Sequence, residues 1–189
     1  MIVRPTVLAC LAAVLPAAFP RPAVAQSGTS SPLAPGSWPL SSVLSAPFVS
    51  DLVASPDGRR LAWIADVEGR RNVLVAEAPR WAARTLTTYR VDDGQELTQP
   101  VWTPDGRGLL FVRGGDRSAA GEYPNPTSDP RGAAQEVWFV RLSGGARRIG
   151  EGTYPAPSPA GDRVAFVLRD TIWSAPLRTA GPARVLFRA

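Results

Sequence analysis

The 189-residue chain is 44% hydrophobic and 20% charged, a balance that excludes general disorder and suits one domain of ordinary size. Its 21 basic residues are all arginine and, with 16 acidic residues, give a net charge of +5. The arginines form no run or stripe along the sequence. We therefore interpret them as a solvated surface and expect no nucleic-acid partner. The 20 Pro and 17 Gly favour short strands and many turns over long helices.

The first segment of the chain has the features of an export signal. Arg4 precedes a short apolar run, and "AVA" at 23–25 supplies the small residues that a signal peptidase cleaves after. The run is short and interrupted by proline, so we expect no stable membrane insertion. A lipoprotein signal ending at Cys10 is the alternative, although almost no apolar stretch precedes this cysteine. We predict a signal peptide at 1–25, a Ser/Pro/Ala-rich linker at 26–47, and a periplasmic or secreted protein.

The rest of the chain repeats one unit three times. Each unit has Ser or Thr, then Pro, a turn containing Gly and an apolar strand, as in "SPDGRRLAWI" at 55–64, "TPDGRGLLFV" at 103–112 and "SPAGDRVAFV" at 158–167. An aromatic residue stands at the same place in each strand: Trp63, Phe111 and Phe166. The turn chemistry favours a positive φ at the glycine. The strands contain few polar residues, which predicts burial on both faces.

Three further short strands belong to each unit, bounded by Gly, Pro, Asp or Asn. One precedes the proline, at 47–54, 97–102 and 152–157. Two apolar runs follow the repeat strand, first at 72–78, 136–142 and 171–177, and then at 83–87, 146–150 and 183–187. Matching positions in the first of these runs are taken by Leu74, Trp138 and Trp173.

An antiparallel meander of four short strands is the blade of a β-propeller. We therefore predict an all-β fold over 48–189, an incomplete β-propeller of about three four-stranded antiparallel blades at 48–87, 97–150 and 152–187. Closed propellers use roughly four to eight blades, so we expect a fragment from the front of a longer chain. The alternative is a complete three-bladed protein or a small sandwich, which would leave two blade edges exposed.

The pattern "SPDGRRLAW…NVLVAEAP…ARTLT" resembles the propeller repeat of TolB-type periplasmic proteins and of serine peptidases of the prolyl oligopeptidase family. "VRGGD" at 112–116, "DDGQELTQPVWTPDG" at 92–106 and the insertion at 121–138 are similar to exported bacterial peptidases of that family. In that family a propeller of seven or eight blades caps an α/β-hydrolase domain. The resemblance implies a propeller fragment that gates peptide access to a C-terminal hydrolase domain absent from this chain. The alternative is a non-enzymatic, TolB-like propeller that binds proteins in the periplasm.

The sequence contains no catalytic machinery of its own. It has no His and no G-x-S-x-G, so a Ser-His-Asp triad cannot form within it. The resemblance makes the parent protein a serine peptidase, while this chain supplies no catalytic residue. Family members of the dipeptidyl-peptidase type hold the substrate amine with adjacent glutamates, which are absent here, so no substrate-binding residue is transferred. We expect no cofactor.

Two other groups of residues could in principle form a metal site or an aromatic stacking surface. Asp92, Asp93 and Glu96 carry the oxygens that a hard cation needs, but "DDGQE" lacks the alternating spacing of a calcium loop. We interpret this stretch as a solvated turn between blades and expect no metal. Four tryptophans offer a possible stacking surface, but their places in the repeat predict blade core instead: Trp63, Trp102, Trp138 and Trp173.

The second unit carries a long insertion, from Gly114 to Pro130, where the other units need only a few residues. Loops of this length in a compact domain are typically functional or disordered. Tyr123, Asn125 and Asp129 provide groups that bind a partner or substrate, so we predict a substrate-gating loop at one rim of the propeller. The alternative is a tolerated surface insertion.

Overall fold

The computed structural model describes residues 39–115 and 134–188. The chain divides into two units, 1–37 and 38–189, and every described residue belongs to the second. The only described helix is α1 (Leu40–Leu44), a single turn with no buried residue, inside the segment predicted as a linker. Within the described residues, no helix has the length and apolarity needed to cross a membrane.

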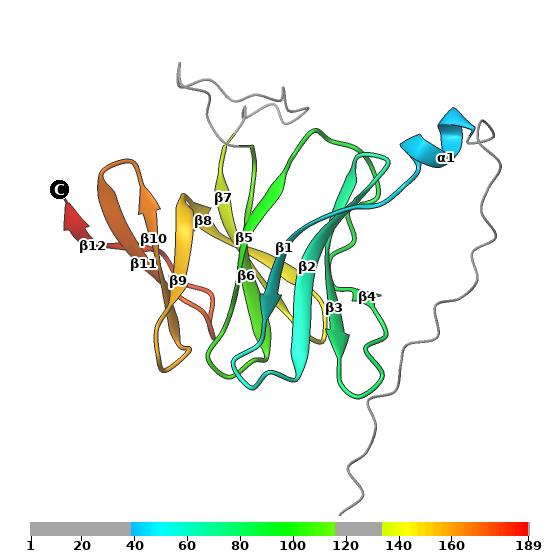
Figure 1. Cartoon of the computed structure of the whole chain (residues 1–189). Coiled ribbons are helices and arrows are strands. Elements are labelled where there is room, and N and C mark those ends of the chain that lie inside the picture. The colour runs from blue at the N-terminus through cyan, green and yellow to red at the C-terminus, as the bar shows by residue number, and fades with distance from the viewer. Residues whose placement is uncertain (1–38, 116–133, 189) are drawn as a thin grey trace, which may run out of the picture. The chain divides into compact units, whose positions relative to one another are not determined.

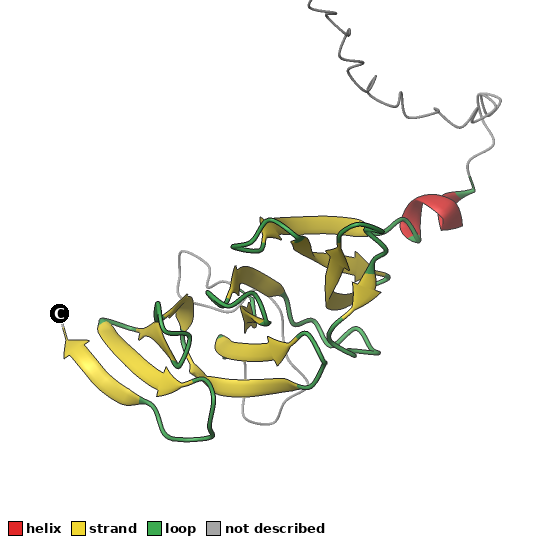
Figure 2. Cartoon of the chain, turned by 90° about the horizontal axis from the view of Figure 1, so that it is seen from below, coloured by secondary structure: helices red, strands yellow, loops and turns green. Residues whose placement is uncertain are grey.

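The strands form three separate four-stranded antiparallel sheets in chain order (Figures 1 and 2). Blade one contains β1 (Phe48–Ala54), β2 (Arg60–Val67), β3 (Arg70–Glu77) and β4 (Arg84–Thr85). Blade two contains β5 (Leu97–Trp102), β6 (Gly108–Arg113), β7 (Glu136–Arg141) and β8 (Ala146–Glu151). Blade three contains β9 (Thr153–Pro157), β10 (Arg163–Leu168), β11 (Thr171–Pro176) and β12 (Arg184–Arg188). The described sheets do not close into a ring, so the predicted incomplete propeller is confirmed.

Strand pairing places the three units in the same register. The aromatic residue of each repeat strand lies opposite the position that the repeat aligned with it, in the pairs Trp63–Leu74, Phe111–Trp138 and Phe166–Trp173. This agreement confirms the repeat alignment at the level of single residues. It also makes equivalent positions in the three blades directly comparable.

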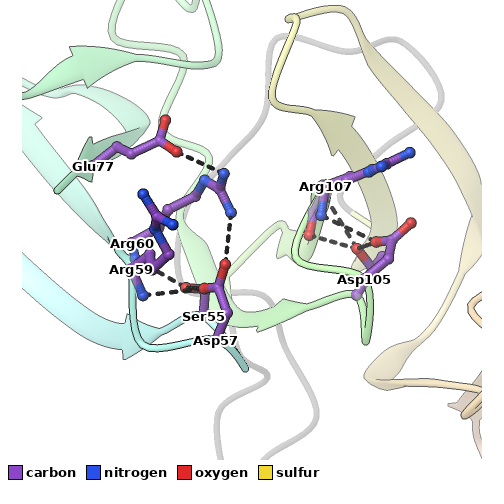
Figure 3. Close-up of polar contacts among 9 residues, drawn as sticks. Ser55, Asp57, Arg59, Arg60, Glu77, Asp105 and Arg107 are labelled. Carbon is purple, nitrogen blue, oxygen red and sulfur yellow. Dashed lines mark hydrogen bonds and ion pairs between the residues drawn. The ribbon is translucent and has the colours of Figure 1, made fainter.

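The turn after each first strand is held by a hydroxyl and a carboxylate, and Figure 3 shows the turns of blades one and two. In blade two, the Thr103 hydroxyl donates to Asp105 Oδ1 at 2.6 Å and accepts from the Gly108 amide at 3.1 Å. Ser55 and Asp57 make the equivalent contacts in blade one. The glycines of the three turns have positive φ, as predicted: Gly58 at 67°, Gly106 at 63° and Gly161 at 64°.

Blade three uses a different residue for the same turn. Its sequence has Ala160 where the other turns have aspartate, which weakened the predicted match. In the structure, the Ser158 hydroxyl donates to Asp162 Oδ1 at 2.7 Å and accepts from the Arg163 amide at 3.1 Å. The carboxylate that accepts this hydrogen bond comes from Asp162, two positions after Ala160, so the turn has the same hydroxyl–carboxylate hydrogen bond as the other two.

Two hydrophobic cores lie between neighbouring blades. The core between blades one and two includes Ile64, Val73 and Phe111, and the core between blades two and three includes Val112 and Phe166, together with further residues of both sheets. All but the last residue of β6 are buried, so the expectation of burial on both faces holds for this strand. It is wrong for β2 and β10, in which buried residues are mixed with residues that are only partly buried. Only blade two has a described neighbour on each side.

Three of the four tryptophans belong to the cores between blades or pack against them, and the fourth does not. Trp102 is buried, and its indole nitrogen donates to the Val53 carbonyl at 3.2 Å across the blade interface. Trp138 and Trp173 pack against the two cores, so the core interpretation is confirmed for these three. Trp63 belongs to neither described core and remains partly exposed.

Candidate binding surface

The residues predicted to gate substrate, Tyr123, Asn125 and Asp129, lie outside the described residues, and their role stays a prediction. The described ends of the insertion are close together. A Cβ on Gly114 would stand 2.2 Å from the Ala134 carbonyl oxygen, so this backbone contact requires glycine.

The first strand of each blade contains a β-bulge at the same place. Asp51, Gln99 and Tyr154 stand at equivalent positions before the three prolines and have φ of 53°, 55° and 53°. The register of each first strand shifts at this point. A positive φ is uncommon for residues other than glycine, and bulges commonly redirect side chains near functional sites. We call these three the bulge residues.

The bulge residues lie on neighbouring strands. β5 contacts β1 on one side and β9 on the other. The Gln99 side-chain oxygen accepts a hydrogen bond from the Tyr154 amide at 2.7 Å, which joins blades two and three directly. Tyr154 keeps 69% of its surface exposed. Each first strand is also the edge of its sheet, so it has backbone groups that no strand of its own sheet pairs.

The edge strands β1, β5 and β9 and the bulge residues together form the candidate binding surface. An unpaired strand edge binds an extended peptide through backbone hydrogen bonds, and neighbouring side chains then provide selectivity. The bulge residues could not be recognised from the sequence, because no glycine marks their positive φ. Their common spacing from the repeated proline was the only available signal.

The acidic stretch between blades one and two is paired internally. Arg113 bonds to Asp93, and Arg71 lies 3.5 Å from Asp92. The two aspartates also accept hydrogen bonds from backbone amides two residues further along the chain, at 3.0 Å each. These contacts favour the turn interpretation over a cation site.

Tyr89, on the same connection, is a structural residue. Its backbone amide and carbonyl both bond to the Asn72 side chain at 2.9 Å, and Arg113 stacks over its ring at 4.9 Å. Burial raises the pKa of Tyr89 to about 12, so the phenol stays protonated at neutral pH. This tyrosine therefore offers no nucleophile or general base near pH 7.

Comparison with known proteins gives structural similarity only. No family model matches the chain, and no curated protein matches it. Among solved structures, TolB from Acinetobacter baumannii is 18% identical with a TM-score of 0.44, over 72% of this chain and 32% of that one. Pyrococcus horikoshii acylaminoacyl peptidase is 16% identical with a TM-score of 0.49, over 74% and 25%.

A third similar structure is the β-propeller domain of the Trilobed protease from Pyrococcus furiosus, with 15% identity, a TM-score of 0.44 and coverage of 69% and 39%. The chain thus spans well under half the length of these three proteins. Similarity at this level carries no information about activity, substrates or partners.

Proposed function

We propose that this chain is the N-terminal propeller segment of an exported serine peptidase of the prolyl oligopeptidase family, and that it screens the access of peptides to a hydrolase domain. The sequence resemblance supports the choice of family. The observation that carries the proposal is the composition of the two outer blade faces. Both have apolar residues at positions that are buried between blades elsewhere in the chain.

The outer face of blade one carries an apolar pair at positions that are buried against a neighbouring blade in the other two blades. Phe111 and Phe166 are 0% and 2% exposed because each packs against the blade before it. Trp63 and Leu74 form the equivalent pair in blade one, and both are partly exposed. An aromatic–aliphatic pair on a pleated face is stabilised chiefly by burial. We infer that a further blade covers this pair in the parent protein.

The outer face of blade three is built to receive a following blade. Cross-strand pairs Ile64–Val73 and Val112–Val137 are buried against the next blade in the first two units. The equivalent pair in blade three is Val167–Ile172, and Ile172 keeps 38% of its surface exposed. Phe187 pairs with Ile172 and extends this apolar face onto β12.

The position of the first strands supports the proposed screening of peptides. In a closed propeller the blades are arranged around a central channel, and the neighbouring strands β1, β5 and β9 would border it. The bulge residues and the unpaired strand edges then face whatever passes through. Peptides are the ligands that such edges recognise.

The complete mature protein provides the test. It should be labelled by a fluorophosphonate at a serine outside this chain, and kcat/KM should be measured on chromogenic dipeptides and on peptides of increasing length. Replacing 116–130 by a short Gly-Ser turn should change kcat/KM for the longer peptides and leave the dipeptides unaffected. A protein that binds no fluorophosphonate and cleaves no peptide would contradict the proposal and favour the TolB-like binding propeller.

A further inference from the structure

A cleft of about 300 Å³ lies where the turns of blade two meet those of blade three. Its lining includes three arginines, Arg107, Arg141 and Arg178, and the apolar side chains of Phe139 and Leu177. We call it the basic cleft. Its volume is at the lower end of the range of small-molecule sites, so it suits a compact ligand.

The lining of the basic cleft carries more positive than negative charge. Asp105 is the one carboxylate in its lining, and this group already accepts hydrogen bonds from the Thr103 hydroxyl and the Arg107 amide. Among the described residues, the guanidinium groups of Arg107 and Arg141 form no ion pair. Arg178 donates to the Ala160 carbonyl at 3.1 Å and forms no ion pair with a described carboxylate, although its charge helps to lower the pKa values of Asp105 and Asp162. Figure 3 shows Asp105 and Arg107 on their turn.

At the equivalent place in blade one, the arginine is paired with carboxylates, so the blade fold does not require an excess of positive charge there. There the residues Arg60 and Glu77 lie opposite each other, and Arg60 bonds to Glu77 at 2.6 Å and to Asp57 at 3.2 Å. The equivalent pair in blade two is Gly108 and Arg141. A glycine has replaced the long basic side chain, and an arginine stands where blade one has its glutamate. The Phe139 ring packs against Gly108, where a Cβ would stand 2.5 Å from Phe139 Cε2. The Arg141 guanidinium is left without a described carboxylate partner.

A fourth arginine adds positive charge beside the cleft. Arg147 donates to the Leu177 carbonyl at 2.8 Å and lies over the Phe139 ring at 5.9 Å. Burial lowers the pKa of Arg147, and the charge of Arg141 lowers it further. Such repulsion between like charges is relieved when an anion binds between them.

We propose that the basic cleft binds the oxyanion group of a small molecule, a phosphate or a carboxylate, with Arg107, Arg141 and Arg178 as its ligands. Guanidinium groups donate paired N–H bonds whose geometry fits both oxyanions. The apolar side chains Phe139 and Leu177 would contact the uncharged part of the ligand. This inference is independent of the proposed peptidase function, because no residue of the cleft belongs to the candidate binding surface.

The test is titration of the complete chain with inorganic phosphate, and separately with malonate, at constant ionic strength. Thermal denaturation reports the binding of either anion, and ³¹P line broadening reports the binding of phosphate. We expect saturable stabilisation by at least one anion, and the one with the lower dissociation constant identifies the oxyanion class. The double variant Arg107→Gln/Arg141→Gln should bind about tenfold or more weakly, since it loses charge-assisted hydrogen bonds.

The matched control is Arg59→Gln/Arg90→Gln, which removes the same charge from exposed positions outside the cleft. It should keep the wild-type affinity. Equal losses in both double variants, or no saturable effect of either anion on the wild type, would overturn the proposal. If the first double variant does not fold, the single variant Arg141→Gln and the wild-type titrations with both anions still decide the outcome.

Discussion

At the level of single residues, the hydroxyl groups of Ser55 and Thr103 hold the turns of blades one and two through two hydrogen bonds each. Ser55 and Thr103 are 4% and 3% exposed, and each hydroxyl donates to a carboxylate and accepts from a backbone amide. A buried hydroxyl with this pattern fixes the turn because its removal leaves the amide without a partner.

Thr103→Val should therefore destabilise the chain by about 1–3 kcal/mol, since valine keeps the shape and removes the hydrogen bonds. Urea denaturation of the variant and of Ser143→Ala, an exposed control, measures the difference. A loss of stability no larger than that of the control would show that the hydroxyl does not hold the turn.

The turn carboxylates make stability depend on pH. Hydrogen bonds from Ser55, Thr103 and Ser158 lower the pKa values of Asp57, Asp105 and Asp162 below their ordinary value of 3.8. A lowered folded-state pKa contributes stability above the unfolded-state value, and this contribution disappears as pH falls through the folded-state value.

We accordingly expect the melting temperature to decline as pH drops below about 4. Asp105→Asn should reduce the slope of that decline, because the amide can still accept hydrogen bonds but does not titrate. Scanning calorimetry between pH 2.5 and 6 measures both proteins. Identical slopes would mean that Asp105 is not among the groups responsible.

At the scale of the strand, the repeated bulge is the feature that most departs from regular geometry. Asp51 is exposed and adopts a left-handed conformation, which costs about 1–2 kcal/mol for residues with a Cβ. Aspartate tolerates it better than a β-branched residue does.

Asp51→Val should thus destabilise blade one by about 1–2 kcal/mol, whereas Asp51→Gly should be neutral or stabilising. Equilibrium unfolding in urea compares the two variants with the wild type. If valine and glycine have the same effect, the bulge does not persist in solution.

The strands themselves were predictable from the sequence, because the repeat fixes their spacing and apolar residues mark their positions. The three strands that precede the prolines begin and end within one residue of the predicted bounds. The bulges were not predictable in the same way, since Asp51, Gln99 and Tyr154 share only their spacing. Asp162 was missed because it performs its role two positions away from the pattern.

The basic cleft was missed for a different reason. Its arginines come from segments far apart in the sequence, and only the packing of blade three on blade two brings Arg178 near Arg107. Sequence analysis treated the scattered arginines as a solvated surface. The register of β6 and β7 was needed to see that Gly108 and Arg141 replace a balanced pair.

At the scale of the whole molecule, the account depends on the two outer blade faces. In this chain, Phe111→Ala should cost about 3–5 kcal/mol because it empties a filled core. Trp63→Ala should cost much less, because no described blade covers its outward side. Urea denaturation of the two variants tests this asymmetry, and equal losses would mean that Trp63 is already packed as a core residue.

The reactivity of Trp63 tests most directly whether a further blade packs against blade one in the proposed longer protein. Hydroxyl-radical footprinting of the proposed longer protein should be compared with the same measurement on the 189-residue chain. We predict that Trp63 is oxidised readily in the chain alone and is protected in the longer protein to the extent that Trp138 is. Equal oxidation of Trp63 in both would contradict the claim that a further blade packs against blade one.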